Sequence, residues 1–123
     1  RPPRGPVTAN SKKGAQLFDN LGCTGCHRPS LGSVTGAYTD LLLHDMGKAL
    51  DSGIKDGVAT GRMWRTMPLW GVRFRKAFLH DERVRSYDKV LEQHDGEAAR
   101  PARAYGALPP QSRALIAAFL NSL

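Results

Sequence analysis

Hydrophobic residues recur at helical spacing near both ends of the chain. The first pattern predicts a helix over residues 10–22, with Asn10 or Ser11 as its N-cap. Its apolar face follows the spacing i, i+3, i+4, i+7 and consists of Gly14, Leu17, Phe18 and Leu21. The last pattern begins at a Pro-Pro pair and predicts a helix over residues 109–123. Its apolar face consists of Leu115, Ile116, Phe119, Leu120 and Leu123. A glycine in mid-helix costs about 1 kcal/mol relative to alanine, so we expect the last helix to cross the first close to Gly14.

Proline and glycine divide the middle of the chain into short segments. A third helix is expected over residues 86–94, capped by Ser86. Its apolar face consists of Tyr87, Val90, Leu91 and His94. Pro68 disfavours a helical Met67, so residues 64–71 are predicted to form an extended strap. The remaining segments are expected to be a short helix, a surface loop and a linker, over residues 72–80, 51–61 and 97–108. Together these elements predict an all-α fold.

The length of 123 residues suits one compact domain, which we place at residues 10–123 after a flexible leader of residues 1–9. Hydrophobic residues make up 41% of the chain and aromatic residues only 7%. The expected core is therefore thin, and a buried cofactor would enlarge it. No apolar run is long enough to span a membrane.

The strongest motif is Cys23-Thr-Gly-Cys-His27, in which two cysteines are spaced C-x-x-C and a histidine follows directly. This pattern is typical of the covalent attachment of one c-type haem. The thiols of Cys23 and Cys26 add across the two haem vinyl groups, and His27 becomes the proximal iron ligand. We expect the Pro29 carbonyl to accept a hydrogen bond from Nδ1 of His27. Bacteria attach such haems outside the cytoplasmic membrane, so we expect a periplasmic protein whose signal peptide has been removed.

Two other uses of a C-x-x-C pair are less well supported by the sequence. A thioredoxin-like redox pair would be surrounded by a βαβ pattern, and none is present. A zinc site would need a second ligand pair at finger spacing, and the chain has no further cysteine. The pattern therefore favours haem over both alternatives.

The net charge of +7 constrains the class of partner. No nucleic-acid-binding motif accompanies it, so we expect no nucleic-acid partner. A basic surface speeds the encounter of a redox carrier with an acidic protein. The candidate docking face consists of Lys76, Arg83, Arg85 and Lys89, with an ordinary solvated patch as the alternative.

The sixth iron ligand remains open from the residue pattern alone. The candidates are His94, Met67, Met46, His44 and His80. His94 lies on the apolar face of its predicted helix, where the pattern fits an iron ligand and a hydrogen-bonded core histidine equally. Met67 lies in a strap that can present its sulfur, but methionine is also a common core filler. His44 and His80 are expected to fix loops by pairing with the aspartate that follows each of them. A second imidazole would favour ferric iron, and a thioether would favour ferrous iron.

Several other residues are expected near a haem. The strap can lie against a flat ligand, with Trp64 or Trp70 at its edge. Arg65, Arg73 and Arg75 can neutralise the haem propionates, since buried carboxylates need partners. For each single arginine, solvated surface charge is the alternative.

Five segments resemble the C-terminal haem domain of the di-haem oxidoreductase family, which is related to bacterial cytochrome c peroxidases. The segments are residues 21–27, 38–47, 64–71, 78–81 and 94–98. The resemblance implies a small fold similar to class I cytochromes c, with the first and last helices crossing. It also implies a distal ligand from the segment before the last helix. That segment carries His94, so the resemblance favours His94 over Met67 and then Met46.

The sequence departs from the family pattern in four places, one of which is a shortened stretch between Pro29 and Tyr38. Glu82 stands where the family usually has glycine, and Met67 where it usually has proline. The family's N-terminal haem domain has no match here, and peroxidase activity would need a second haem with an open coordination site. We therefore expect a monohaem electron carrier rather than a catalyst, passing single electrons to or from a protein partner. The alternatives are a haem domain of a larger peroxidase-like oxidoreductase and a haem-based gas sensor.

Overall fold

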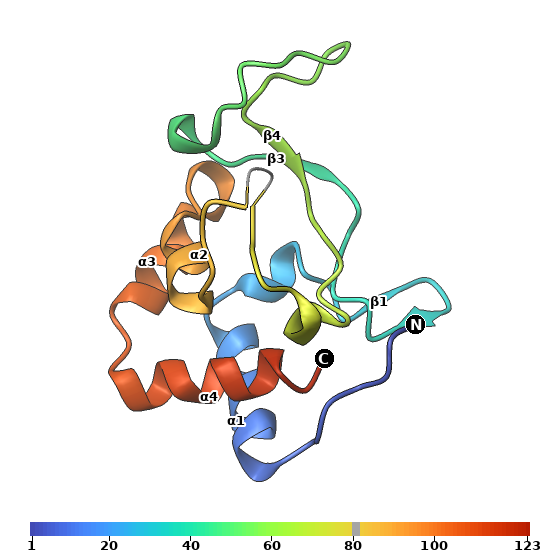
Figure 1. The fold of residues 1–123 in the computed structure, drawn as a ribbon, viewed down its shortest axis with the longest axis vertical. Helices are drawn as coiled ribbons and strands as arrows, with labels where there is room; N and C mark the ends of the chain where they lie inside the picture. Colours follow the sequence, from blue (N-terminus) through green and yellow to red (C-terminus); the bar gives the residue numbers. More distant parts are fainter. Residues whose placement is uncertain (80–81) are drawn as a thin grey trace.

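The computed structural model describes residues 1–79 and 82–123. The α-helices are α1 (Ala9–Asn20), α2 (Tyr87–Glu92), α3 (Ala99–Gly106) and α4 (Pro110–Leu120) (Figure 1). The strands are β1 (Ser30–Leu31), β2 (Val34–Thr35), β3 (Leu43–Asp45) and β4 (Met63–Arg65). Short 3₁₀ turns are η1 (Cys23–Gly25), η2 (Lys48–Leu50), η3 (Val72–Phe74) and η4 (Gly96–Ala98). The helix pair α1 and α4 occupies one end of the molecule, and the β3–β4 ribbon lies toward the other (Figure 1).

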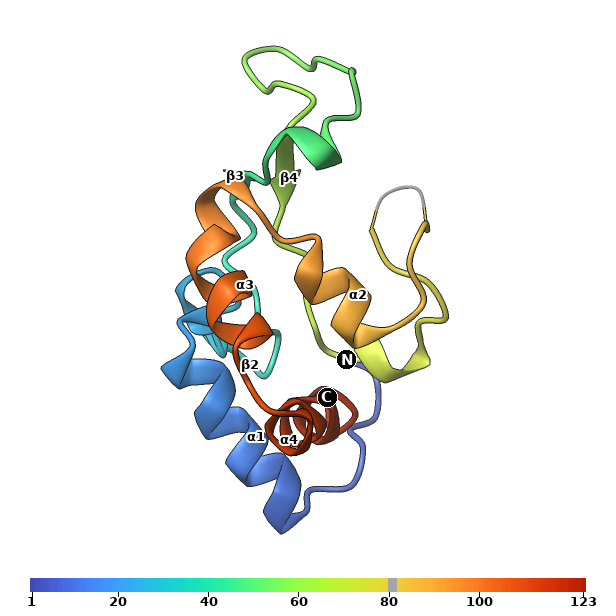
Figure 2. The same ribbon diagram turned by 90° about the vertical axis from the view of Figure 1, so that its left-hand side faces the viewer.

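Helices α1 and α4 pack across each other, as their apolar patterns predicted (Figures 1 and 2). A Cβ atom on Gly14 would lie 1.9 Å from the carbonyl oxygen of Leu115, so only glycine lets the two backbones come this close. The N-cap of α1 is Thr8 instead of Asn10 or Ser11. Ser11 completes a capping box, because the Thr8 hydroxyl accepts from the Ser11 N–H and the Ser11 hydroxyl accepts from the Thr8 N–H.

The buried core lies along this helix crossing. Its members are Phe18, Val72, Tyr105, Ile116, Phe119, Leu120 and Leu123. A shell of partly buried apolar side chains packs against the core and includes Leu17, Leu21, Tyr38, Leu69, Phe78, Tyr87 and Leu91. Cys23 belongs to the same shell, so the C-x-x-C-H motif begins at the edge of the core. The start of the motif, which follows α1, therefore lies in apolar surroundings.

The all-α prediction is wrong, because the chain also forms two small antiparallel sheets. Strand β1 pairs with β2 in a short hairpin. Strand β3 pairs with β4, with His44 opposite Trp64. Strands of two or three residues are too short to display an alternating pattern. The β3–β4 pairing also joins segments distant in sequence, so no local signal announces it.

Two predicted boundaries also differ from the structure. The expected linker over residues 97–108 contains helix α3, whose alanines and arginines are strong helix formers. The expected helix over residues 72–80 is reduced to the turn η3, which Gly71 precedes at a φ of +71°. The last residue of that expected helix, His80, lies outside the described residues. Helix α2 follows its predicted cap, Ser86, whose hydroxyl accepts from the Lys89 N–H.

The residues expected to be a flexible leader contact the end of the chain. The Gly5 N–H donates to the Ser122 carbonyl at 3.2 Å, and a Cβ on Gly5 would lie 2.1 Å from the Asn121 carbonyl oxygen. Arg73 donates to the Pro3 carbonyl at 3.0 Å. These contacts place the first residues of the chain against the C-terminal end of α4. No helix in the described part of the chain is long and apolar enough to cross a membrane.

Residues 46–62 leave the body between β3 and β4 as an extended arm (Figure 1). Val58 is 101% exposed and Ile54 is 73% exposed, so the arm carries apolar side chains into solvent. The arm closes on itself where Gly61 lies close to Asp51 and Gly53. This agrees with the surface loop expected over residues 51–61.

Candidate haem-binding site

The C-x-x-C-H motif directly follows the first core helix. Gly22 adopts a φ of +90° at the end of α1, and the chain turns through η1 into Cys26. The Cys23 carbonyl accepts the His27 N–H at 3.0 Å, which keeps the motif in one tight turn. Both cysteines are free thiols. Burial raises the pKa of Cys23 to about 11, and burial, followed by the nearby carboxylates of Asp40 and Glu97, raises that of Cys26.

The imidazole of His27 is oriented by a backbone carbonyl. Its Nδ1 lies 3.1 Å from the Tyr38 carbonyl oxygen. The Pro29 carbonyl, which we expected in this role, instead accepts the Gly36 N–H at 2.7 Å. Burial lowers the pKa of His27 to about 4, so the ring is neutral at pH 7. With Nδ1 on a carbonyl, Nε2 is the atom that can bind a metal.

Tyr38 presents this carbonyl in an unusual conformation. Its φ of +55° lies in the left-handed region, which is costly for a residue with a side chain. The aromatic ring offsets this cost by packing edge-on against Phe119, with ring centroids 5.3 Å apart, and against Phe18. Phe18 also contacts the His27 ring at 6.1 Å between centroids. His27 is thus held by the hydrophobic core.

His94 has the same hydrogen-bonding pattern as His27. It follows the C-terminal end of α2, and its Nδ1 lies 2.7 Å from the Val90 carbonyl oxygen. Burial lowers the pKa of His94, so this ring is neutral as well. The two histidines are close enough that charge on His94 would disfavour charge on His27. The fold thus brings together two neutral imidazoles, each with Nδ1 on a backbone carbonyl.

The other candidate ligands lie in different settings. Met67 is 52% exposed and Met46 is partly buried. Both ring nitrogens of His44 are bonded to carboxylates, Nε2 to Asp40 at 2.8 Å and Nδ1 to Glu97 at 2.6 Å. The expected pairing of His44 with the aspartate that follows it is therefore wrong. His80 lies outside the described residues.

The tryptophan and arginines expected near the haem have backbone partners. Trp70 is partly buried, and its backbone N–H donates to the Ala37 carbonyl at 3.4 Å. Arg65 is exposed and donates to the Leu41 carbonyl. Arg73 and Arg75 donate to backbone carbonyls of the leader and of the strap, those of Pro3 and Pro68. All four residues of the expected docking face are exposed, namely Lys76, Arg83, Arg85 and Lys89.

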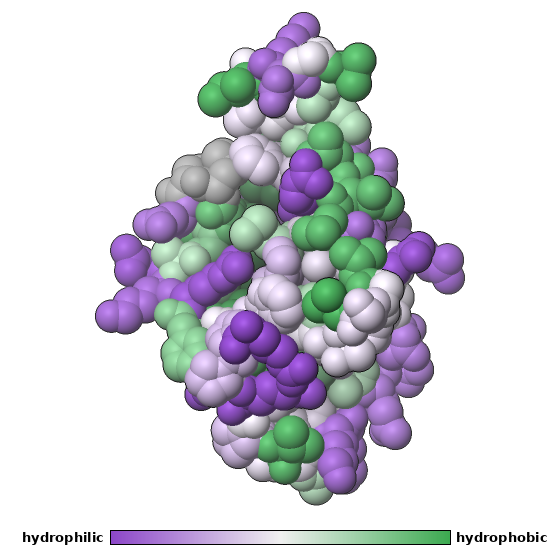
Figure 3. Space-filling view, turned by 90° about the vertical axis from the view of Figure 1, so that its right-hand side faces the viewer, coloured by the Kyte–Doolittle hydropathy of each residue, from purple (hydrophilic) through white to green (hydrophobic). Residues whose placement is uncertain are grey.

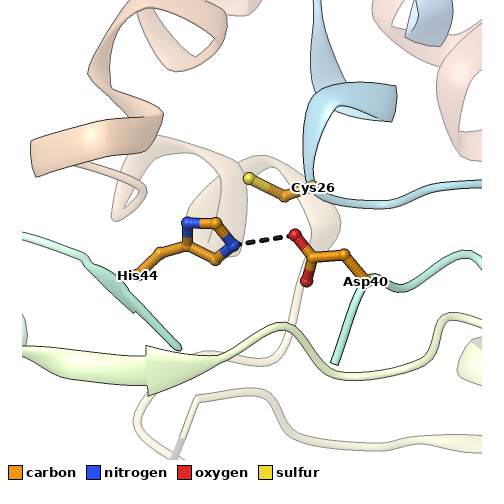
Figure 4. A group of neighbouring side chains, drawn as sticks. All are labelled: Cys26, Asp40 and His44. Atoms are coloured by element: carbon orange, nitrogen blue, oxygen red, sulfur yellow. Dashed lines mark hydrogen bonds and ion pairs between the residues drawn. The ribbon is translucent and has the colours of Figure 1, made fainter. Parts of the chain in front are cut away.

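Sequence reasoning missed a polar cluster beside the second cysteine (Figure 4). The ligand atoms of Cys26, Asp40 and His44 all lie within 4.8 Å of one another. Asp40 and His44 are joined by a hydrogen bond, and the sulfur of Cys26 faces the same space (Figure 4). The spacing Asp-x-x-x-His is a signal that could have suggested the pair. The contact with Glu97 depends on tertiary packing and has no local signal.

Hydrophobic side chains are exposed over the same end of the molecule. The β3 patch, as we call it, consists of Leu41, Leu42, Leu43 and Met67. Their exposed fractions lie between 40% and 57%. Figure 3 shows hydrophobic side chains gathered in a stripe on the face that carries the β3–β4 ribbon. Arg65 pairs with Leu43 in the sheet, so a positive charge lies at the edge of the patch.

The residues present fit a covalently bound haem. Two free thiols stand at C-x-x-C spacing, and two neutral imidazoles lie near each other. Apolar side chains such as Leu69, Phe78 and Leu91 are partly buried and, like Cys23, pack against the hydrophobic core. A hollow of about 350 Å³ opens beside His94, lined also by Ala99 and Arg103 of α3. Two thiols for attachment and two imidazoles for the iron form a donor set that a six-coordinate haem would use.

Comparisons with known proteins identify the family and a similar fold. No curated protein matches the chain. The fold is similar to that of hydrazine synthase from Kuenenia stuttgartiensis, in a structure determined under xenon pressure, with a TM-score of 0.70 and 19% sequence identity. The match covers 95% of this chain and 47% of that chain, so this chain spans about half the length of its structural neighbour. A family model described as "Di-haem oxidoreductase, putative peroxidase" matches residues 2–123. The chain therefore belongs to the di-haem oxidoreductase family.

Proposed function

We propose that this chain carries one haem, bonded covalently through Cys23 and Cys26, and exchanges single electrons with a protein partner. His27 and His94 are the proposed iron ligands. The observation that carries the proposal is the matched pair of neutral imidazoles, each with Nδ1 on a backbone carbonyl. The family's printed description supports haem as the cofactor.

The residues of the chain have distinct tasks in this function. Cys23 and Cys26 would hold the haem, because each thiol S–H would add across one vinyl C=C bond, forming one S–C and one C–H bond without an oxidant. The Tyr38 and Val90 carbonyls orient the two imidazoles and increase the electron density on Nε2. Apolar side chains keep water away, which reduces the reorganisation that accompanies electron transfer. When bound, the haem supplies the ferric–ferrous couple.

The test is to produce the chain in a bacterium that attaches haem in the periplasm, the compartment we propose for this protein. The mass should exceed that of the polypeptide by one haem, and the pyridine haemochrome should be that of a c-type haem. The oxidised protein should show no methionine-to-iron charge-transfer band. His94→Ala should let carbon monoxide bind rapidly to the reduced protein, whereas the matched control Met67→Ala should not. A bare polypeptide mass or a methionine band would contradict the proposal.

We further propose that the partner is an acidic redox protein that docks on the β3 patch. The net charge of +7, the exposed leucines and the arginine beside them support this face. Strand β3 also carries His44, whose ring lies beside Cys26, so the patch lies near the proposed attachment edge of the haem. In contrast, the expected docking residue Lys89 forms an ion pair with Glu92 at 3.0 Å.

The docking proposal can be tested by reversing charges on the two faces. With an acidic blue-copper protein as electron acceptor, Arg65→Glu should slow the second-order rate several-fold at low ionic strength. Raising the salt concentration should remove most of that difference. The control Lys89→Glu should have a smaller effect, and an equal or larger effect would favour the face expected from the sequence.

A second candidate function has one observation in its favour. The matching family model is described as "Di-haem oxidoreductase, putative peroxidase", and this sequence contains a single C-x-x-C-H motif. The chain would then act as one haem domain of a larger peroxide-reducing enzyme. Peroxide turnover by the isolated chain, with a readily displaced sixth ligand, would favour this candidate. Rapid binding of carbon monoxide to the reduced wild-type protein would instead indicate a gas sensor.

A further inference from the structure

His44 is held between two carboxylates from different parts of the chain. Its Nε2 lies 2.8 Å from Oδ2 of Asp40, and its Nδ1 lies 2.6 Å from Oε2 of Glu97. The exposed side-chain fractions are 5% for Asp40, 17% for His44 and 55% for Glu97. We call this group the Asp40–His44–Glu97 clamp. Two hydrogen bonds from one imidazole to two carboxylates favour its charged form and are of the charge-assisted type.

The electrostatics of the clamp agree with this geometry. Burial alone would lower the pKa of His44, but the hydrogen bonds to Asp40 and Glu97 raise it overall. Burial would raise the pKa of Asp40, yet hydrogen bonds from Leu42, Thr66 and His44 lower it overall. The Asp40 carboxylate, at the buried end of the clamp, is therefore ionised and accepts several hydrogen bonds.

The two ends of the clamp belong to segments that carry different residues of the proposed haem site. Asp40 lies beside Cys26, the second attachment residue. Glu97 lies in η4, three residues after His94 in the sequence. The clamp thus links the attachment side of the site to the turn that follows the distal histidine.

The backbone around the clamp is packed closely as well. A Cβ on Gly96 would lie 2.2 Å from the Asp45 carbonyl oxygen, and a Cβ on Gly47 would lie 2.9 Å from Cβ of Asp95. The turn after His94 therefore rests directly on the end of β3. The hydrogen bond from His94 to Val90 fixes the ring only relative to α2. On the other side of His94 in the sequence, residues 95–97 are held by this packing and by the clamp.

A metal ion is a poorer explanation of the cluster than a clamp. Cys26 would have to act as a thiolate, whereas its thiol is consumed when a haem is attached. Both nitrogens of His44 already have carboxylate partners, so neither is left for a metal. The hydrogen-bonding groups of His44, Asp40 and Glu97 therefore bond to one another.

We propose that His44 is a positioning residue, which, through Asp40 and Glu97, holds the turn after His94 against β3 and so keeps His94 on the iron. This inference rests on the proposed ligation by His27 and His94. The turn can move away from β3 only when the contact between His44 and Glu97 breaks. Loss of the clamp should thus increase the fraction of time for which the distal coordination site is open.

The test measures how fast carbon monoxide binds to the reduced, haem-loaded protein, because it binds only when His94 has left the iron. Glu97→Gln removes the charge at the exposed end of the clamp and preserves its shape. Loss of a charge-assisted hydrogen bond should raise the binding rate about tenfold. The oxidised spectrum should also gain a high-spin component, which a purely structural role would not produce. The matched control is Glu92→Gln, which removes a carboxylate two residues before His94 and should leave the rate unchanged.

A double-mutant cycle sharpens the test. If His44 and Glu97 act together, His44→Gln combined with Glu97→Gln should be no faster than the faster single variant. Additive effects, or equal effects of Glu97→Gln and Glu92→Gln, would overturn the clamp. Both glutamates have exposed side chains, so these variants should fold.

The two proposals fail in different ways. If His94→Ala leaves the binding of carbon monoxide unchanged, His94 is not the ligand and the proposed coordination fails. If His94→Ala accelerates binding but Glu97→Gln does not, the coordination stands and the clamp alone fails.

Discussion

The α1–α4 crossing and the β3–β4 end of the molecule are stabilised in different ways. The crossing buries large apolar side chains such as Phe18, Ile116 and Phe119. The β3–β4 end is held by hydrogen bonds and ion pairs, while Leu42 and Met67 remain about half exposed. We therefore expect the first region to be stable through its own contacts and the second to depend on what is added to it. A haem and a partner protein are the additions that we propose.

The largest effect should come from preventing attachment of the haem. In the double variant Cys23→Ala and Cys26→Ala, amides of α1 and α4 should remain protected from hydrogen exchange. Amides of β3 and β4 should exchange at least about 100-fold faster than in the haem-loaded protein, because local opening is then opposed by few apolar contacts. Uniform loss of protection would show that both regions depend equally on the haem.

A smaller effect is expected at the helix crossing itself. Gly14→Ala should lower the free energy of unfolding by about 3 kcal/mol, because the new Cβ would lie 1.9 Å from the Leu115 carbonyl oxygen. The control is Gly106→Ala, also in a helix, where a Cβ would meet no atom within 4 Å. That change should stabilise the protein by about 0.5–1 kcal/mol. Urea unfolding measures both values. Similar values for the two variants would contradict the close crossing.

The smallest effect concerns a strained residue in the loop region. Glu82 has a φ of +55°, which a side chain disfavours. Glu82→Gly should raise the free energy of unfolding by about 1 kcal/mol, measured as an increase in Tm. Glu92→Gly, in helix α2, should lower it by a similar amount. A destabilised Glu82→Gly variant would show that the side chain contributes more than its backbone conformation costs.

The same contrast explains which parts of the fold could be predicted. The periodic apolar positions of α1 and α4 are a local signal, and Gly14 marked the crossing because glycine is otherwise costly in a helix. The strands were missed because β3 depends on pairing with β4 across the arm. Helix α3 was missed because proline lies within it, although Pro101 occurs in its first turn, where proline is tolerated.

The part of the candidate site that could be predicted is the part defined by spacing along the sequence. Cys23, Cys26 and His27 are adjacent in sequence, so the motif needs no knowledge of the fold. The Tyr38 carbonyl could not be foreseen, because Tyr38 lies 11 positions after His27 and reaches it only through tertiary packing. Glu97 likewise reaches His44 across 53 positions of sequence. Assignment of His94 as the distal ligand remains a prediction.

Because of Tyr38, the two proposed iron ligands are held with unequal rigidity. Its carbonyl orients His27, and its ring is wedged against Phe18 and Phe119 of the crossing helices. His94 stands on a six-residue helix and a turn. If small molecules ever gain access to the iron, they should enter from the His94 side, because the opposite imidazole can tilt only if the helix pair shifts with it. Small molecules would thus have one preferred route to the iron, on the side of the histidine that the core does not support.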